Sequence, residues 1–221
     1  MKKTLAIAIA GAAMTVASPA FADIIQVNPS SIQGSNVLFN GGDQNGTTVT
    51  GATQGGTNVN FTGTTLGGGN ILNASGGQAS LTGDFDTSTP QPNDTLGLTS
   101  INFGLEGGAY FDTVELNLFG TSGATADFTL TDDGGQTFTF TGIALSNGQN
   151  RLGFQAINGQ HIANVAFNLT SGTISDVRQV RIGTGQQVGG VPEPAAWALM
   201  MAGFGLTGAA LRRPRRKSQI A

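Results

Sequence analysis

The chain has 221 residues, a formal net charge of −3, one histidine and no cysteine. Without cysteine it has no disulfides, thiolate catalysis or thiolate metal sites. Residues 23–190 contain three arginines, no lysine and twelve acidic residues, so their formal charge is −9. Nucleic-acid binding needs clustered cationic side chains, and this composition argues against it.

The first 22 residues have the three parts of a secretory signal peptide. A basic start is followed by an apolar stretch over residues 5–16 and by an A-x-A cleavage site at Ala20 and Ala22. We therefore expect signal peptidase to cut before Asp23. Both the signal peptide and the C-terminal segment are left out of the fold prediction.

The first half of the exported region, up to residue 97, is rich in Gly, Asn, Thr, Ser and Gln. Short alternating runs lie between double glycines, a pattern typical of short strands joined by tight turns. If part of the domain is loosely ordered, we expect it to be residues 40–80. The predicted strands include residues 37–39, 47–50, 58–62, 70–72 and 79–82.

Apolar alternation is clearer after a proline-containing loop at residues 87–94. The strongest signal is a hairpin, Thr125 to Thr141, that turns at the Asp/Gly run 132–135. No window has a helical period. The pattern predicts an all-β domain over residues 23–183, an antiparallel β-sandwich of the jelly-roll kind. Further strands are predicted at residues 101–105, 114–118, 152–156, 163–169 and 174–182.

Catalytic residues are scarce in the exported region. His161 follows a turn, and no nucleophile elbow of the G-x-S-x-G type accompanies it. Two carboxylates for glycoside hydrolysis could come from Asp112 with Glu115, or from Asp84 with Asp86. Exposed acidic residues on an acidic protein explain these pairs more simply, so no catalytic residue is assigned.

Calcium is a better use of the acidic residues, since Ca²⁺ prefers oxygen ligands. Asp84 and Asp86 lie on one side of an extended segment, while Asp132 and Asp133 lie at the hairpin tip. Neither pair supplies enough ligands alone, and no EF-hand spacing is present. These four residues are therefore weak calcium candidates, and no other cofactor is predicted.

Two of the three arginines lie in the last predicted strand. Asp176 and Arg178 fall on one face of it, and we expect them to pair, while Arg181 follows three residues later. Residues 23–190 have no tryptophan and a single tyrosine, Tyr110. This argues against a flat aromatic platform for glycans, although Asn, Asp and Gln in loops could still hydrogen-bond sugars.

The C-terminal segment, residues 191–217, follows a Gly/Gln linker at residues 184–190. A Pro-Glu-Pro motif is followed by an uncharged apolar run, residues 195–211, and then by a basic cluster. A helix of 17 residues spans about 25 Å, close to the hydrocarbon core of a bilayer. Because basic residues stay in the cytoplasm, the exported domain should lie on the other side of the membrane.

These elements in this order resemble the PEP-CTERM sorting signal, in the variant whose motif continues into Trp-Ala. The same tail is also labelled an ice-binding-protein C-terminal domain, which describes the tail and not ice binding. The resemblance implies recognition by an exosortase-type membrane protease. An unprocessed membrane anchor is the alternative. The residues that carry the resemblance are Pro192, Glu193, Pro194, Trp197, Arg212, Arg213, Arg215 and Arg216.

The resemblance also implies export from a Gram-negative bacterium and association with exopolysaccharide or biofilm. We expect a non-enzymatic protein of the cell envelope or extracellular matrix. It would be held in the inner membrane by its C-terminal helix before processing, and would then reach the cell surface or matrix. A glycan-binding module held in the exopolysaccharide is the alternative, and an envelope hydrolase is a third hypothesis.

Overall fold

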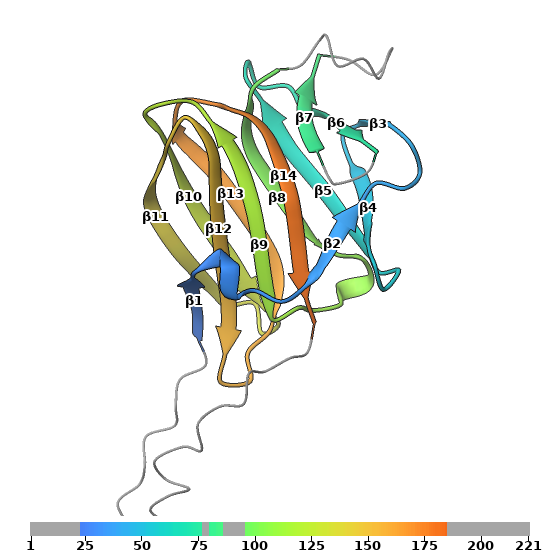
Figure 1. Cartoon of the computed structure of the whole chain (residues 1–221), viewed down its shortest axis with the longest axis vertical. Helices are drawn as coiled ribbons and strands as arrows, with labels where there is room; N and C mark the ends of the chain where they lie inside the picture. The colour runs from blue at the N-terminus through green and yellow to red at the C-terminus, as the bar shows by residue number, and fades with distance from the viewer. Residues whose placement is uncertain (1–22, 77–79, 86–95, 185–221) are drawn as a thin grey trace, which may run out of the picture. The chain divides into compact units, whose positions relative to one another are not determined.

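The computed structural model describes residues 23–76, 80–85 and 96–184 (Figure 1). The predicted signal peptide, the loop at 87–94, nearly all of the linker and the sorting tail lie outside these residues, as does Asp86. Within the described ranges, no helix has the length and apolar character needed to span a membrane. The helix predicted at 195–211 is therefore not tested.

The described residues form an all-β domain of fourteen strands, every pair of which is antiparallel. Apart from two 3-10 turns, Pro29–Ser31 and Glu106–Gly108, they contain no helix. The strands are β1 (Asp23–Val27), β2 (Ser35–Leu38), β3 (Gln44–Gly46), β4 (Val49–Thr53), β5 (Asn58–Thr65), β6 (Ile71–Ser75), β7 (Ser80–Asp84), β8 (Leu98–Leu105), β9 (Thr113–Gly120), β10 (Ala124–Asp132), β11 (Thr137–Leu145), β12 (Gly148–Ile157), β13 (Ile162–Ser171) and β14 (Ile174–Gly183).

Apolar alternation predicted the second half of the domain well. The expected hairpin is confirmed as β10 and β11, in which Phe128 lies opposite Phe140 and Leu130 opposite Phe138. The first half agrees in outline, because the runs predicted as strands overlap β2, β4, β5, β6 and β7, whereas the short β3 was not predicted. Asn and Thr side chains on these short strands hydrogen-bond across the sheet, as Thr50 Oγ1 does to Asn60 Oδ1 at 2.8 Å.

The strands form one sheet, which is barrel-like, so the predicted sandwich of two separate sheets is wrong. The order along the sheet is β1-β12-β9-β14-β2-β4-β5-β8-β13-β10-β11. Strand β14 makes this continuity possible, since one edge pairs with β9 while the other meets three strands in turn. Arg181 pairs with β2, Arg178 with β7, and Ile174 with β8.

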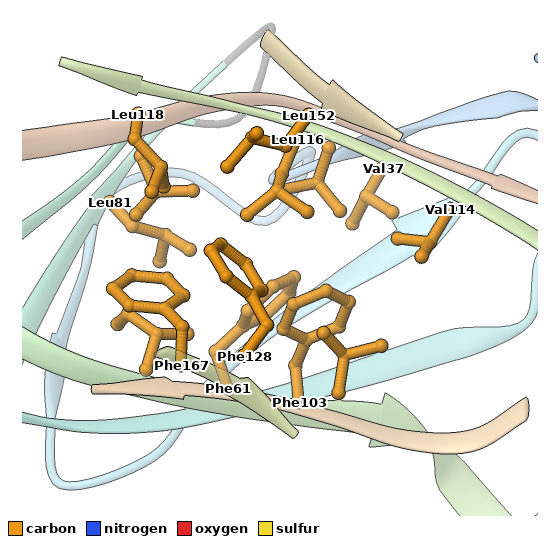
Figure 2. Close-up of a cluster of buried hydrophobic side chains, with 14 of the residues drawn as sticks. Val37, Phe61, Leu81, Phe103, Val114, Leu116, Leu118, Phe128, Leu152 and Phe167 are labelled. Atoms are coloured by element: carbon orange, nitrogen blue, oxygen red, sulfur yellow. The ribbon is translucent and has the colours of Figure 1, made fainter. Parts of the chain in front are cut away.

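The core lies between two groups of strands that face each other across it (Figure 2). Leucines and valines from β9 and neighbouring strands meet phenylalanines from β5, β8, β10 and β13, all almost fully buried. The rings of Phe61 and Phe103 stack with centroids 5.1 Å apart. Burying one such side chain contributes roughly 1.5–3 kcal/mol, so this core can stabilise the domain without disulfides.

Strand β9 is buried on both of its faces. Alternation directs Val114, Leu116 and Leu118 into the core, so that Glu115 and Asn117 point to the outside. Both are nevertheless only 1% exposed. Other side chains must therefore cover the outer face of β9, and those side chains form the site described next.

Candidate functional site

The outer face of β12, β9 and β14 carries all three arginines of residues 23–190. Strand β9 lies between the other two (Figure 1), and the strand registers align their outward residues in rows. We call this surface the arginine face. Its rows are Gln149–Phe119–Asp176, Arg151–Asn117–Arg178 and Gly153–Glu115–Arg181.

Glu115 is the charged centre of the arginine face. Arg151 donates to its Oε1 from Nε at 2.7 Å and also from Nη2. Arg181 donates to Oε2 from Nη1 at 3.4 Å, and its Nη2 reaches the carbonyl oxygen of Gly34 at 3.4 Å. Two cations therefore share one buried carboxylate, which leaves an excess positive charge on this surface.

Arg178 is held by two neighbours. Its Nε lies 2.6 Å from Oδ1 of buried Asp176, and its Nη2 donates to Oδ2 at 3.0 Å. This confirms the pair expected from the sequence. The guanidinium also lies 4.2 Å from the ring centroid of Phe119, a cation–π contact. Arg178 is thus fixed in position, with its Nη1 side directed away from Asp176.

A pocket of about 290 Å³ lies beside Arg178. Asn117 lies at its base, where Nδ2 donates to Oε1 of Gln149 at 3.4 Å and to Oε1 of Gln179 at 3.3 Å. Its Oδ1 is buried and has no hydrogen-bond partner among the described residues. Such a group is costly to bury unpaired, and it belongs to a residue that lines the pocket. The lining residues are Ser80, Asn117, Phe119, Gln149, Arg178 and Gln179.

Gln179 reaches the pocket through a backbone irregularity. Its φ is +51°, in the left-handed region that residues other than glycine rarely adopt. The register of β14 against β9 shifts between Arg178 and Arg181, which marks a β-bulge. Adjacent residues of a regular strand point to opposite faces, but the bulge lets Arg178 and Gln179 line one pocket. Strain of this kind is concentrated at functional sites.

A second depression, of about 380 Å³, lies over β5 and β8 and has no charged lining residue. Two of its lining hydroxyls hydrogen-bond to each other, since Thr64 Oγ1 lies 2.7 Å from Ser100 Oγ. It lacks the cationic side chain that the pocket beside Arg178 has. Its lining residues are Thr47, Thr48, Thr62, Gly63, Thr64, Asn70, Ser100 and Asn102.

Two of the calcium candidates already have protein partners. Asp84 is buried and accepts from Asn45 Nδ2 at 2.8 Å and from its neighbour's backbone N–H at 2.6 Å. Asp132 is also buried, and accepts from the backbone N–H of Gln136 at 2.6 Å and from Gln160 Nε2. Asp133 is exposed beside it. In the part of the chain that the structure describes, no group of three Asp, Glu or His side chains is arranged to hold a metal.

The carboxylates considered for hydrolysis belong to different clusters. Oδ1 of Asp112 lies 2.5 Å from Nδ1 of His161. His161 is the residue immediately before β13. The ring of Tyr110 stacks over His161, with centroids 6.4 Å apart. Glu115 lies in the arginine face with its two cations. Each of these two carboxylates therefore has a basic partner of its own. The other candidate pair, Asp84 with Asp86, is not tested, because Asp86 lies outside the described residues.

Sequence reasoning missed most of the pocket. Asn117 has the spacing of an ordinary solvent-facing strand residue, and Gln149 and Gln179 belong to no motif. The one available signal was the scarcity of cationic side chains, because three arginines in an otherwise acidic domain are candidates for ion pairs or ligand contacts. The sequence alone could not show that Arg151 joins Arg178 and Arg181 on one surface, since β12 and β14 become neighbours of β9 only in the fold.

No protein-family model matches the chain, and no curated protein shows significant sequence similarity to it.

Proposed function

We propose that the chain is an exported, non-enzymatic protein of the cell envelope or extracellular matrix of a Gram-negative bacterium. The observation that carries this proposal is the order of three unlike elements at the C-terminus: Pro192-Glu193-Pro194, the apolar run 195–211 and the arginine cluster from Arg212. The signal peptide supports the same topology independently. An exosortase-type protease would process the tail, and signal peptidase the N-terminus.

The extent of the fold supports this division of the chain. Strand β14 ends at Gly183, ahead of the Gly/Gln linker and the Pro-Glu-Pro motif. Asp84, Asp112 and Glu115 each make contacts within the fold, which accounts for these acidic residues without a catalytic role.

A glycan-binding module is the second candidate, and the pocket beside Arg178 favours it. Planar amides and a guanidinium can hydrogen-bond to sugar hydroxyls in fixed directions. The two candidates are compatible, since a protein retained in a polysaccharide matrix needs a surface that contacts the polymer.

The test is mass spectrometry of the protein from a producing Gram-negative host, with and without its exosortase. We expect the secreted form to begin at Asp23 and to end near Pro192-Glu193-Pro194. Deleting the exosortase should leave the intact tail in the membrane fraction. A full-length C-terminus in the membrane of both strains would instead support the permanent anchor, and a cytoplasmic protein that retains Met1 would refute export.

A further inference from the structure

The pocket beside Arg178 is lined mainly by polar side chains. One of them, Asn117, has a buried Oδ1 that has no partner among the described residues. Gln149 and Gln179 each accept from Asn117 through Oε1, which leaves their amide nitrogens to donate to a ligand. A sugar ring carries hydroxyls that both donate and accept, so its chemistry matches this mixture.

We propose that this pocket binds one acidic sugar residue, a hexuronate, within an extracellular polysaccharide. The inference deepens the proposed function and rests on it, because the protein must be exported to meet such a polymer. The volume of about 290 Å³ is at the lower end of small-molecule pockets and suits a single ring.

Local charge favours an acidic ligand in spite of the acidic composition of the domain. The arginine face holds Arg151, Arg178 and Arg181 against two carboxylates, Glu115 and Asp176. At physiological ionic strength, exposed charges are screened beyond about 8 Å. A ligand in the pocket therefore responds mainly to this positive surface, and less to acidic residues elsewhere on the domain.

Arg178 is prepared to receive a carboxylate. Asp176 occupies the Nε and Nη2 edge of its guanidinium, and the ring of Phe119 supports its flat side. Arg178 lines the pocket, and its Nη1 takes part in neither of the two contacts with Asp176. A side chain that is ordered before binding loses little conformational entropy when the ligand arrives.

The aromatic residues argue against a neutral sugar that stacks on an open ring. Phe119 is the only aromatic residue that lines the pocket, and Arg178 lies over its ring. Among the described residues, the exposed aromatic side chains are Phe85 and Tyr110, and neither lines the pocket. Recognition must therefore depend on hydrogen bonds and charge.

The experiment measures binding of the full-length chain, purified in non-ionic detergent, by isothermal titration calorimetry. The probes are oligogalacturonate, the same oligomer with its carboxylates methyl-esterified, and polyglutamate as an acidic polymer without sugar rings. We expect the oligogalacturonate to bind. The ester should bind at least about tenfold more weakly, because it loses a charge-assisted hydrogen bond. Polyglutamate should not bind measurably at moderate salt.

Variants locate the site. Gln149→Ala and Gln179→Asn should each weaken binding about three- to tenfold, the effect of one lost or misplaced hydrogen bond. Arg178→Lys keeps the charge but loses the planar geometry, and should weaken binding by a similar factor or more. Ser100→Ala, in the depression over β5 and β8, is the matched control and should bind as the unmodified chain does. If Arg178→Lys does not fold, the test depends on Gln149→Ala, which should fold because Gln149 is exposed.

Three results would overturn the proposal: equal binding of the ester and the acid, equal binding of polyglutamate, or unchanged affinity in all the pocket variants. Export is measured separately, because pocket variants should be secreted and processed as the unmodified chain is. A chain that binds oligogalacturonate but is never exported would refute the proposed function and leave the pocket assigned. A chain that is exported but fails to bind would refute the pocket alone.

Discussion

Arg151 and Glu115 lie on neighbouring strands, one outward row apart, and the Nε of Arg151 donates to a Glu115 carboxylate oxygen at 2.7 Å. Only 1% of Glu115 is exposed, whereas nearly half of the Arg151 side chain is. The guanidinium of the arginine contacts the carboxylate, while part of the arginine side chain stays exposed to water. This contact allows β9 to be buried on both faces, and it places the positive charge beside the pocket.

Replacing Glu115 with alanine should destabilise the domain strongly. Arg151 and Arg181 would lose the carboxylate that they share, and breaking a buried ion pair costs about 3–5 kcal/mol. We expect a loss near 3 kcal/mol in chemical denaturation, since both arginines are partly exposed. Glu106→Ala is the matched control: Glu106 is exposed, bonds only Asn58 in the described contacts, and should cost less than about 1 kcal/mol. Similar losses in the two variants would contradict this role of Glu115.

Gln179→Gly should raise stability and reduce ligand binding at once. Glycine adopts φ near +51° without steric cost, and a strained residue of this kind costs about 1–3 kcal/mol. Part of that gain is offset by the entropy of glycine in the unfolded chain, so we expect a net gain of about 1 kcal/mol. Thermal melting and oligogalacturonate titration measure the two effects. Gln149→Ala should weaken binding without this gain, and a Gln179→Gly variant that melts lower would contradict the strain.

Asp132→Ala should destabilise the turn between β10 and β11. The carboxylate accepts from the backbone N–H of Gln136 and from buried Gln160, and hydrogen bonds to charged groups contribute about 1.5–3 kcal/mol. We expect a loss of about 2 kcal/mol, together with faster amide hydrogen exchange at Gln136. The neighbouring Asp133→Ala should change stability by less than about 0.5 kcal/mol, because Asp133 is exposed. The assignment of Asp132 as the turn's anchor would be wrong if the two variants behaved alike.

Calcium should leave the melting temperature unchanged. Asp84 and Asp132 are the buried calcium candidates, and both already accept hydrogen bonds from protein donors that a cation would have to displace. Ligand binding to the folded state raises stability according to the ligand concentration, so a calcium site would reveal itself in a titration. Differential scanning calorimetry with added Ca²⁺ and then with chelator measures this. A rise with Ca²⁺ that the chelator reverses would show that the acidic residues hold a metal.

The strands of this domain were predictable because their cause is local. Period-two alternation at Val114, Leu116 and Leu118 predicts a strand with one apolar face, whichever strands that face packs against. The Asp/Gly run after Leu130 favours a turn whatever it packs against. In the first half the short β3 was not predicted, since strands rich in Asn and Thr are stabilised in part by cross-strand hydrogen bonds, such as Thr50 to Asn60, that have no apolar pattern.

Local pattern could not predict the joining of the strands into one sheet. The alternation along β14 shows which residues face the core, but it does not show which strands lie at its second edge. That edge pairs with β2 at Arg181, with β7 at Arg178 and with β8 at Ile174. These contacts join residues far apart in the chain, and the prediction of two separate sheets failed at this strand.

The sequence by itself determined the all-β class, the acidic and cysteine-free composition of residues 23–190, and the two terminal segments on which the export proposal rests. Each of these depends on residues that are neighbours in the chain. The tertiary structure alone decided that Arg151, Arg178 and Arg181 share one surface, that Asn117 is buried beneath it, and that a bulge directs Gln179 to its pocket. The register between distant strands sets these positions. Hydrogen bonding across the sheet aligns these residues, and their separation in the sequence does not show which of them will lie side by side.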